Sequence, residues 1–109
     1  MNELTIWQNI KQNASKVGRG TTRIFLELYY VLKSPDTPIW DKTIIVSALS
    51  YQFLPKQILN REKHGLLGYA DNLVTLMLAY NRVKRRVTPQ IAMQVDKILN
   101  QWFGYTMIK

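Results

Sequence analysis

Cysteine is the residue type that this chain lacks altogether, and histidine occurs only once, as His64. Without cysteine the chain forms neither a disulfide framework nor a thiolate metal site, and its composition is compatible with a reducing compartment. A typical zinc site needs several imidazole or thiolate ligands. Because the acidic residues are scattered along the chain, they do not replace those ligands. We therefore expect no bound metal and no cofactor.

Long apolar runs are also missing. The two longest apolar tracts, residues 43–54 and 66–80, fall short of the roughly 20 residues that span a bilayer, and Asp71 interrupts the second. The segment Met1 to Ile10 carries no basic stretch followed by a continuous apolar run, so we expect no secretory signal. These absences favour a cytoplasmic protein, with a peripheral position at the inner membrane as the alternative.

Acidic residues are scarce relative to basic ones. The chain has 15 lysines and arginines against 7 aspartates and glutamates, which gives a formal net charge of +8. Such an excess favours association with nucleic acid, anionic lipid or an acidic protein, and does not choose among them. The apolar fraction of 47% is ordinary for a globule. The length of 109 residues suits one folded domain with a buried core.

Apolar residues recur at spacings of three and four along most of the chain, which is the pattern of amphipathic helices. Glycine and proline interrupt this pattern at Gly18 to Gly20, Pro35 to Pro38, Pro55 and Thr88-Pro89. No region shows the alternation expected of strands. The sequence therefore predicts an all-α fold, a compact bundle of four to five helices in a single domain. The predicted helices span residues 2–17, 21–33, 38–53, 69–87 and 89–103.

Two threonine-proline steps mark helix starts. Thr37-Pro38 and Thr88-Pro89 each match a threonine N-cap followed by proline at the first helical position. Asp41 then falls in the first turns of the helix that begins at Pro38, where a carboxylate suits the helix dipole. Trp40, like most aromatic residues of the chain, lies on an apolar helix face, so we expect it to pack in the core. Glu27, in contrast, is expected to face water.

Five short motifs follow one another along the chain: SPDTPIWDK at 34–42, ALSYQFLP at 48–55, GYADNL at 68–73, VTP at 87–89 and WFG at 102–104. In this order they resemble the YkvA-like family of bacterial proteins of unknown function. The resemblance covers most of the chain and implies an all-helical domain, often predicted to sit at or near membranes. It brings no established activity, so no catalytic residue is transferred.

The resemblance also divides the chain and shows where it departs from its apparent relatives. Residues 1–20 form an N-terminal amphipathic helix with its Gly-Arg-Gly break, residues 21–104 form the YkvA-like helical domain, and residues 105–109 form a short tail. Family members usually carry an acidic Asp-x-Ile-Pro-Asp stretch where this chain has KQILN at 56–60. Their paired aspartates after glycine-tyrosine correspond here to Asp71-Asn72. Most of the acidic groups of the family are thus absent.

Asp71 and Asn72 form the candidate polar site. One interpretation makes Asp71 a cation ligand, a proton acceptor or a buried ion-pair partner, since burying an unpaired charge costs free energy. The other places it in the first turn of the predicted helix, where free backbone N–H groups and the helix dipole satisfy it. Gly68 just upstream favours this structural interpretation. Because Ser47 and Ser50 have no obvious base and no phosphate-binding glycine loop occurs, we predict no catalytic residue.

Two basic stretches are the candidate sites for an anionic partner. Their members are Arg82, Lys84, Arg85 and Arg86 in the first stretch, and Lys56, Arg61 and Lys63 in the second. The first stretch carries more charge than a helix C-terminus needs to balance its dipole. Interleaved aromatics and a convincing helix-turn-helix spacing are missing. A membrane surface or an acidic protein is therefore favoured over nucleic acid.

These features predict a non-enzymatic interaction domain that acts at the cytoplasmic membrane surface or on a protein partner. The basic stretches, the family resemblance and the apolar tail at residues 102–108 support this hypothesis; the tail can pack back, dimerise or insert shallowly into an interface. A second hypothesis, nucleic-acid binding, depends on the same charge. A third is a degenerate enzyme or a cation-binding protein centred on Asp71.

Overall fold

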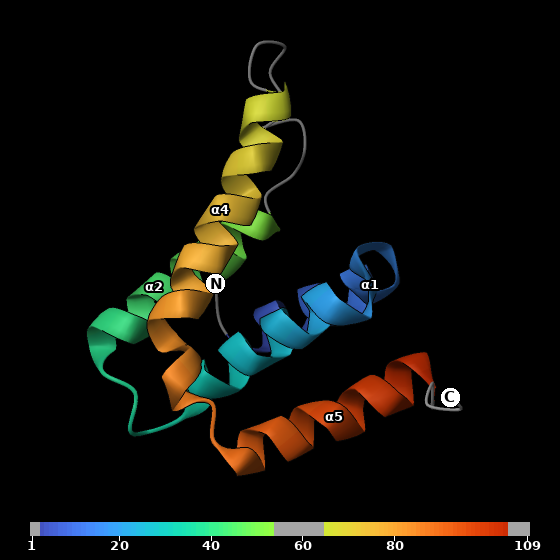
Figure 1. Cartoon of the computed structure of the whole chain (residues 1–109), viewed down its shortest axis with the longest axis vertical. Coiled ribbons are helices and arrows are strands. Elements are labelled where there is room, and N and C mark those ends of the chain that lie inside the picture. The colour runs from blue at the N-terminus through green and yellow to red at the C-terminus, as the bar shows by residue number, and fades with distance from the viewer. Residues whose placement is uncertain (1–2, 54–64, 105–109) are drawn as a thin grey trace.

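Helices make up almost all of the described chain (Figure 1). The computed structural model describes residues 3–53 and 65–104, with the side chains of the second range described from Val74 onward. No strand occurs within these ranges, so the predicted all-α fold is confirmed. None of the helices in the described ranges is long and apolar enough to cross a membrane. The helices are α1 (Glu3–Lys33), α2 (Ile39–Gln52), α4 (Gly65–Val83), the short 3-10 helix η2 (Lys84–Arg86) and α5 (Pro89–Phe103).

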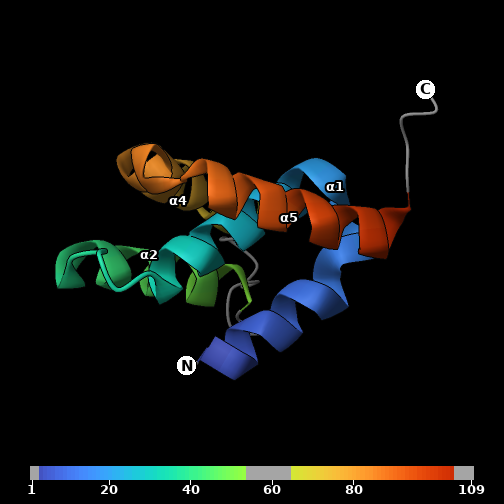
Figure 2. The same cartoon turned by 90° about the horizontal axis from the view of Figure 1, so that it is seen from below.

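Helix α1 turns back on itself at Gly18, as the blue and cyan halves in Figure 2 show. Gly18 has φ 87° and ψ 169°, far from helical values. In a straight helix Trp7 and Tyr29 would lie about 33 Å apart, whereas their ring centroids are 5.2 Å apart. Across the turn, the buried hydroxyl of Thr22 donates to the carbonyl oxygen of Ala14 at 3.4 Å. The predicted Gly-Arg-Gly break is therefore confirmed, and its first glycine makes the turn.

The core lies where both halves of α1 meet the other helices. Helix α1 packs against α5 on one side and against α2 on the other, and α2 in turn packs along α4 (Figure 1). Aromatic rings extend the core at its edge, where Trp7 packs against Trp102 of α5 with centroids 5.4 Å apart. The largest fully buried side chains are Ile6, Ile10, Phe25, Leu26, Leu28, Val31, Ile45, Leu49, Leu76, Val83, Val95 and Leu99.

The two predicted threonine-proline starts differ in the structure. At the start of α5, Thr88 accepts a hydrogen bond from the backbone N–H of Ile91 at 3.1 Å, as predicted. At the start of α2, Thr37 caps no helix; its hydroxyl donates to the carbonyl oxygen of Val31 at 2.7 Å. That bond fastens the loop between α1 and α2 to the end of α1, and α2 begins at Ile39.

Two side chains lie opposite to the predicted side of their helices. Trp40, predicted to pack in the core, exposes 72% of its surface, and Ile39 beside it exposes 71%. Glu27, predicted to face water, is 6% exposed. Periodicity identifies an apolar face but not its width. The exact limits of that face depend on which helices pack against it.

The two glycines of the break should respond to alanine in opposite directions. Gly18→Ala places a side chain at φ 87°, in a region used almost only by glycine, and should destabilise the fold by about 1–3 kcal/mol. Gly20→Ala lies in helical backbone and should stabilise it by up to about 1 kcal/mol. A Cβ at either position meets no atom within 4 Å, so steric clashes do not disturb the comparison. Urea denaturation measures both variants, and equal stabilities would contradict the turn at Gly18.

Candidate functional site

Asp41 is a buried carboxylate held between two arginines. It lies in the first turn of α2, and only 9% of its side chain is exposed. Its Oδ1 accepts a hydrogen bond from Nε of Arg82 at 3.1 Å, and its Oδ2 accepts one from Nε of Arg86 at 2.8 Å. We call this arrangement the Asp41 clamp. It joins the start of α2 to the end of α4 and to η2.

The clamp keeps the Asp41 carboxylate charged. Burial raises the pKa of this carboxyl, because a charge is costly away from water. The hydrogen bonds and the attraction from Arg82 and Arg86 outweigh burial, so the pKa of Asp41 lies below its ordinary value. Two of the four charges of the first predicted basic stretch are therefore committed to an internal contact. The remaining two, on Lys84 and Arg85, belong to exposed residues.

The clamp gathers several segments at one end of the molecule, which we call the basic end and define as residues 33–42 and 82–90. In Figure 1 these segments meet at the bottom: the loop after α1, the start of α2, η2 and the start of α5. They carry six basic residues against two acidic ones. The exposed Ile39 and Trp40 lie in the same end. The basic end therefore contains both cations and exposed apolar side chains.

An open depression of about 440 Å³ lies within the basic end, between the loop after α1 and η2. It is bordered by three short segments that are far apart in the sequence. Its wall combines hydroxyl, guanidinium and carboxylate groups. The lining residues are Ser34, Asp36, Thr37, Arg85, Arg86 and Thr88.

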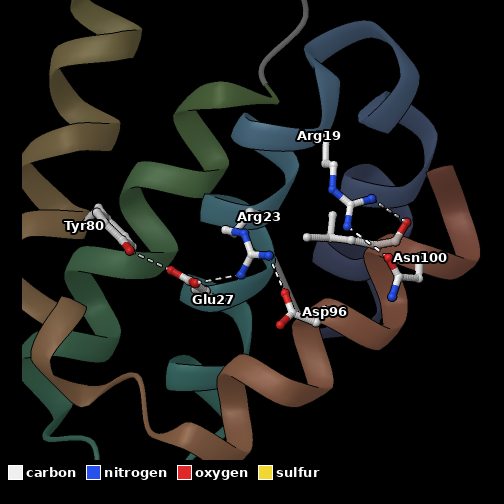
Figure 3. A network of polar contacts seen from close by, with 7 residues as sticks. Arg19, Arg23, Glu27, Tyr80, Asp96 and Asn100 are labelled. Atoms are coloured by element: carbon white, nitrogen blue, oxygen red, sulfur yellow. Dashed lines mark hydrogen bonds and ion pairs between the residues drawn. The ribbon is translucent and has the colours of Figure 1, made fainter. Parts of the chain in front are cut away.

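A second polar network surrounds the buried Glu27 (Figure 3). The hydroxyl of Tyr80 on α4 donates to Oε1 of Glu27 at 2.7 Å, and Nη1 of Arg23 lies 3.6 Å from Oε2. Arg23 also pairs with Asp96 on α5. The hydrogen bond to Glu27, together with burial, raises the pKa of Tyr80 to about 12. One buried carboxylate thus links α1, α4 and α5.

Arg19 provides a further link between α1 and α5 (Figure 3). Its Nη1 donates to the carbonyl oxygen of Leu99 at 3.3 Å, and its Nη2 donates to Oδ1 of Asn100 at 3.0 Å. A cation near the last turns of a helix suits the partial negative charge there. This arginine occupies the middle of the Gly-Arg-Gly break, where the glycine pattern alone gave it no function.

The predicted polar pair Asp71 and Asn72 lies well inside α4, because α4 begins at Gly65. The predicted first-turn position of Asp71 is therefore wrong. Gly68, which favours the first-turn interpretation in the sequence, lies inside α4, because a glycine weakens a helix by about 1 kcal/mol without ending it. The side chains of Asp71 and Asn72 lie outside the described part, so a binding function for them stays a prediction.

Other predicted features also lie outside the described residues: Lys56, Arg61, Lys63, His64 and the tail 105–109. At the other end of α4, the predicted continuation as α-helix to Val87 is wrong. The α-helix stops at Val83, and the chain tightens into η2, as helix ends often do. Among the described side chains, no group of three or more histidines, aspartates or glutamates could hold a metal ion.

Comparison with protein-family models, with curated proteins and with solved structures finds no match to this chain. The resemblance of residues 21–104 to the YkvA-like family therefore stays a prediction.

Asp41→Asn should destabilise the protein by about 1–3 kcal/mol, since both arginines lose a charged acceptor. Because the pKa of Asp41 is lowered in the folded state, its contribution is present above about pH 4 and is lost as the pH falls through the folded pKa. Urea denaturation should show the difference between wild type and variant shrinking below about pH 4. Asp36→Asn, at an exposed aspartate of the preceding loop, is the matched control. A pH-independent difference would contradict the clamp.

Tyr80→Phe should destabilise the protein by about 1–3 kcal/mol, because the buried Glu27 carboxylate loses a hydrogen-bond donor. Since the pKa of Tyr80 is raised to about 12, its contribution is present below the ordinary tyrosine pKa of about 10. It is lost as the pH rises towards the folded pKa. Denaturation at neutral and alkaline pH measures this trend. Tyr51→Phe on α2 serves as the control, and an equal loss there would count against the network.

Proposed function

We propose that this protein is a non-enzymatic interaction domain that binds anionic membrane surfaces through its basic end. The observation that carries the proposal is the combination of two exposed apolar side chains, Ile39 and Trp40, with the exposed cations Lys84 and Arg85. An anionic bilayer offers a counterpart for each kind of group. Its headgroups attract cations, and its interfacial layer accepts apolar side chains.

Trp40 is the strongest single support for a bilayer. A tryptophan ring is both apolar and able to donate a hydrogen bond, and it favours the headgroup level of a membrane. In this protein the ring is 72% exposed, directly before the clamped Asp41. The clamp ties the first turn of α2 to η2, so it holds Trp40 near the basic residues. A preformed arrangement loses less conformational freedom on binding than a flexible one.

Membrane binding is favoured over nucleic-acid binding by the same pair of apolar residues. Protein–DNA interfaces are more polar and more positively charged than other interfaces. A row of aromatic rings that could stack on successive bases is typical of single-strand binders, whereas the basic end offers Trp40 together with the aliphatic Ile39. Phosphates alone would leave Ile39 without a favourable contact.

Vesicle co-sedimentation tests the proposal with two variants. Lys84→Gln with Arg85→Gln removes two surface cations, each worth about 1 kcal/mol near an anionic membrane, so affinity should fall about thirtyfold. Trp40→Ala should weaken binding on its own. Arg82 and Arg86 are left unchanged, because their loss would leave the buried Asp41 without its partners.

The matched controls make the same changes elsewhere. Lys11→Gln with Lys16→Gln removes the same charge from the exposed side of the N-terminal half of α1, and Met93→Ala truncates a side chain of α5 that is 67% exposed. Binding should weaken much less in both. The proposal would be refuted if each control variant weakened binding as much as its test variant, or if binding did not depend on the charge of the lipid. Competition by an oligonucleotide with a steep salt dependence would favour nucleic acid instead.

A further inference from the structure

The depression on the basic end brings together hydrogen-bond donors from three segments. Ser34 comes from the loop after α1, Arg85 and Arg86 come from η2, and Thr88 is the N-cap of α5. Several of these groups already form hydrogen bonds within the protein. These internal bonds determine which donors and acceptors stay available for a ligand in the depression.

The hydroxyls of Ser34 and Thr88 already accept a hydrogen bond from the backbone, whereas the third hydroxyl of the wall, that of Thr37, donates to the carbonyl oxygen of Val31. Oγ of Ser34 accepts from the N–H of Asp36 at 3.3 Å, and Oγ1 of Thr88 accepts from the N–H of Ile91 at 3.1 Å. A hydroxyl whose oxygen accepts in this way keeps its hydrogen for another partner. Ser34 and Thr88 therefore act as donors towards a ligand in the depression.

The two arginines add guanidinium donors on the η2 side. Arg86 donates to Asp41 through Nε, so its Nη donors take no part in that bond, and the bond limits how the guanidinium can turn. Its side chain is 29% exposed, and Arg85 is exposed beside it. Guanidinium groups bind phosphate oxygens through paired N–H donors, which makes arginine more selective for phosphate than lysine.

Asp36 contributes a negatively charged hydrogen-bond acceptor, its carboxylate, to the depression. A free phosphate ion would be repelled by this carboxylate, whereas a hydroxyl group of the ligand would donate to it. The wall therefore suits a ligand that has a phosphate at one end and hydroxyl groups at the other. That chemistry is found in phosphorylated sugar alcohols.

We infer that the depression binds the phosphomonoester of a phosphorylated polyol, with Arg85, Arg86, Ser34 and Thr88 around the phosphate and Asp36 on a polyol hydroxyl. If the ligand is the headgroup of a lipid, this inference rests on the proposed membrane binding, and the site makes that binding selective for lipids that carry a phosphorylated polyol. As a free metabolite, it would occupy the same site without a membrane. The shared chemistry is the phosphate ester, and the two sources are separated by experiment.

The test compares vesicles of equal total charge that contain either phosphatidylinositol phosphate or phosphatidylserine. Wild type should prefer the phosphoinositide vesicles by about tenfold, because arginine and hydroxyl donors reach the phosphomonoester. Arg85→Lys keeps the charge but loses the paired donors, so it should abolish the preference for the phosphoinositide vesicles. Lys84→Arg, a charge-conserving change in the same 3-10 helix, should retain the preference for the phosphoinositide vesicles. Ser34→Ala should reduce the preference without touching the cap of α5.

Soluble inositol bisphosphate, measured by calorimetry against inorganic phosphate, supplies the second arm. Binding of inositol bisphosphate without any vesicle binding would support the site for a free ligand and refute the proposed membrane function. Equal binding to the two vesicle types would refute the site and leave the membrane function standing. Equal losses of preference in Arg85→Lys and Lys84→Arg would also refute it. Asp36→Asn should raise the affinity for inorganic phosphate, since a like charge is removed.

Discussion

A single buried carboxylate sets the arrangement of the basic end. Asp41 is stable in its charged form only where two guanidinium groups reach it, and both come from residues that follow α4 or end it. Breaking a buried ion pair leaves an uncompensated charge and typically costs several kcal/mol. The start of α2 must therefore meet the end of α4, and the loop before α2 must lie beside η2. The depression between the loop after α1 and η2 lies beside this contact and includes Arg86 in its wall.

Internal pairing also decides which charges remain for a partner. The buried acidic residues in the described ranges are Glu27 and Asp41, and each is paired with arginine. Arg23, Arg82 and Arg86 thus serve the fold. The formal net charge of +8 counts them equally with the exposed lysines. A ligand at the basic end therefore meets the exposed Lys84 and Arg85 together with the part of Arg86 that its bond to Asp41 leaves accessible.

Local signals predicted the helices well, because their causes lie within a few residues. The turn at Gly18 and the cap at Thr88 depend on one residue and its immediate neighbours. The burial of Glu27 and Asp41 depends on Tyr80, Arg82 and Arg86, which lie far along the chain. Spacing within one helix contains no information on such partners. The basic cluster was visible in the sequence, but the fold was required to show that Arg82 and Arg86 pair with the buried Asp41.

The intrinsic fluorescence of the protein comes from three tryptophans that lie in two different environments. Trp7 and Trp102 pack with ring centroids 5.4 Å apart at the edge of the core, close enough to exchange excitation energy. Trp40 belongs to the basic end, and 72% of its surface is in contact with solvent. A water-soluble quencher reaches Trp40 first. The protein therefore needs no added label: the fluorescence of Trp7 and Trp102 reports on helix packing, and that of Trp40 reports on whether a ligand or membrane covers the basic end.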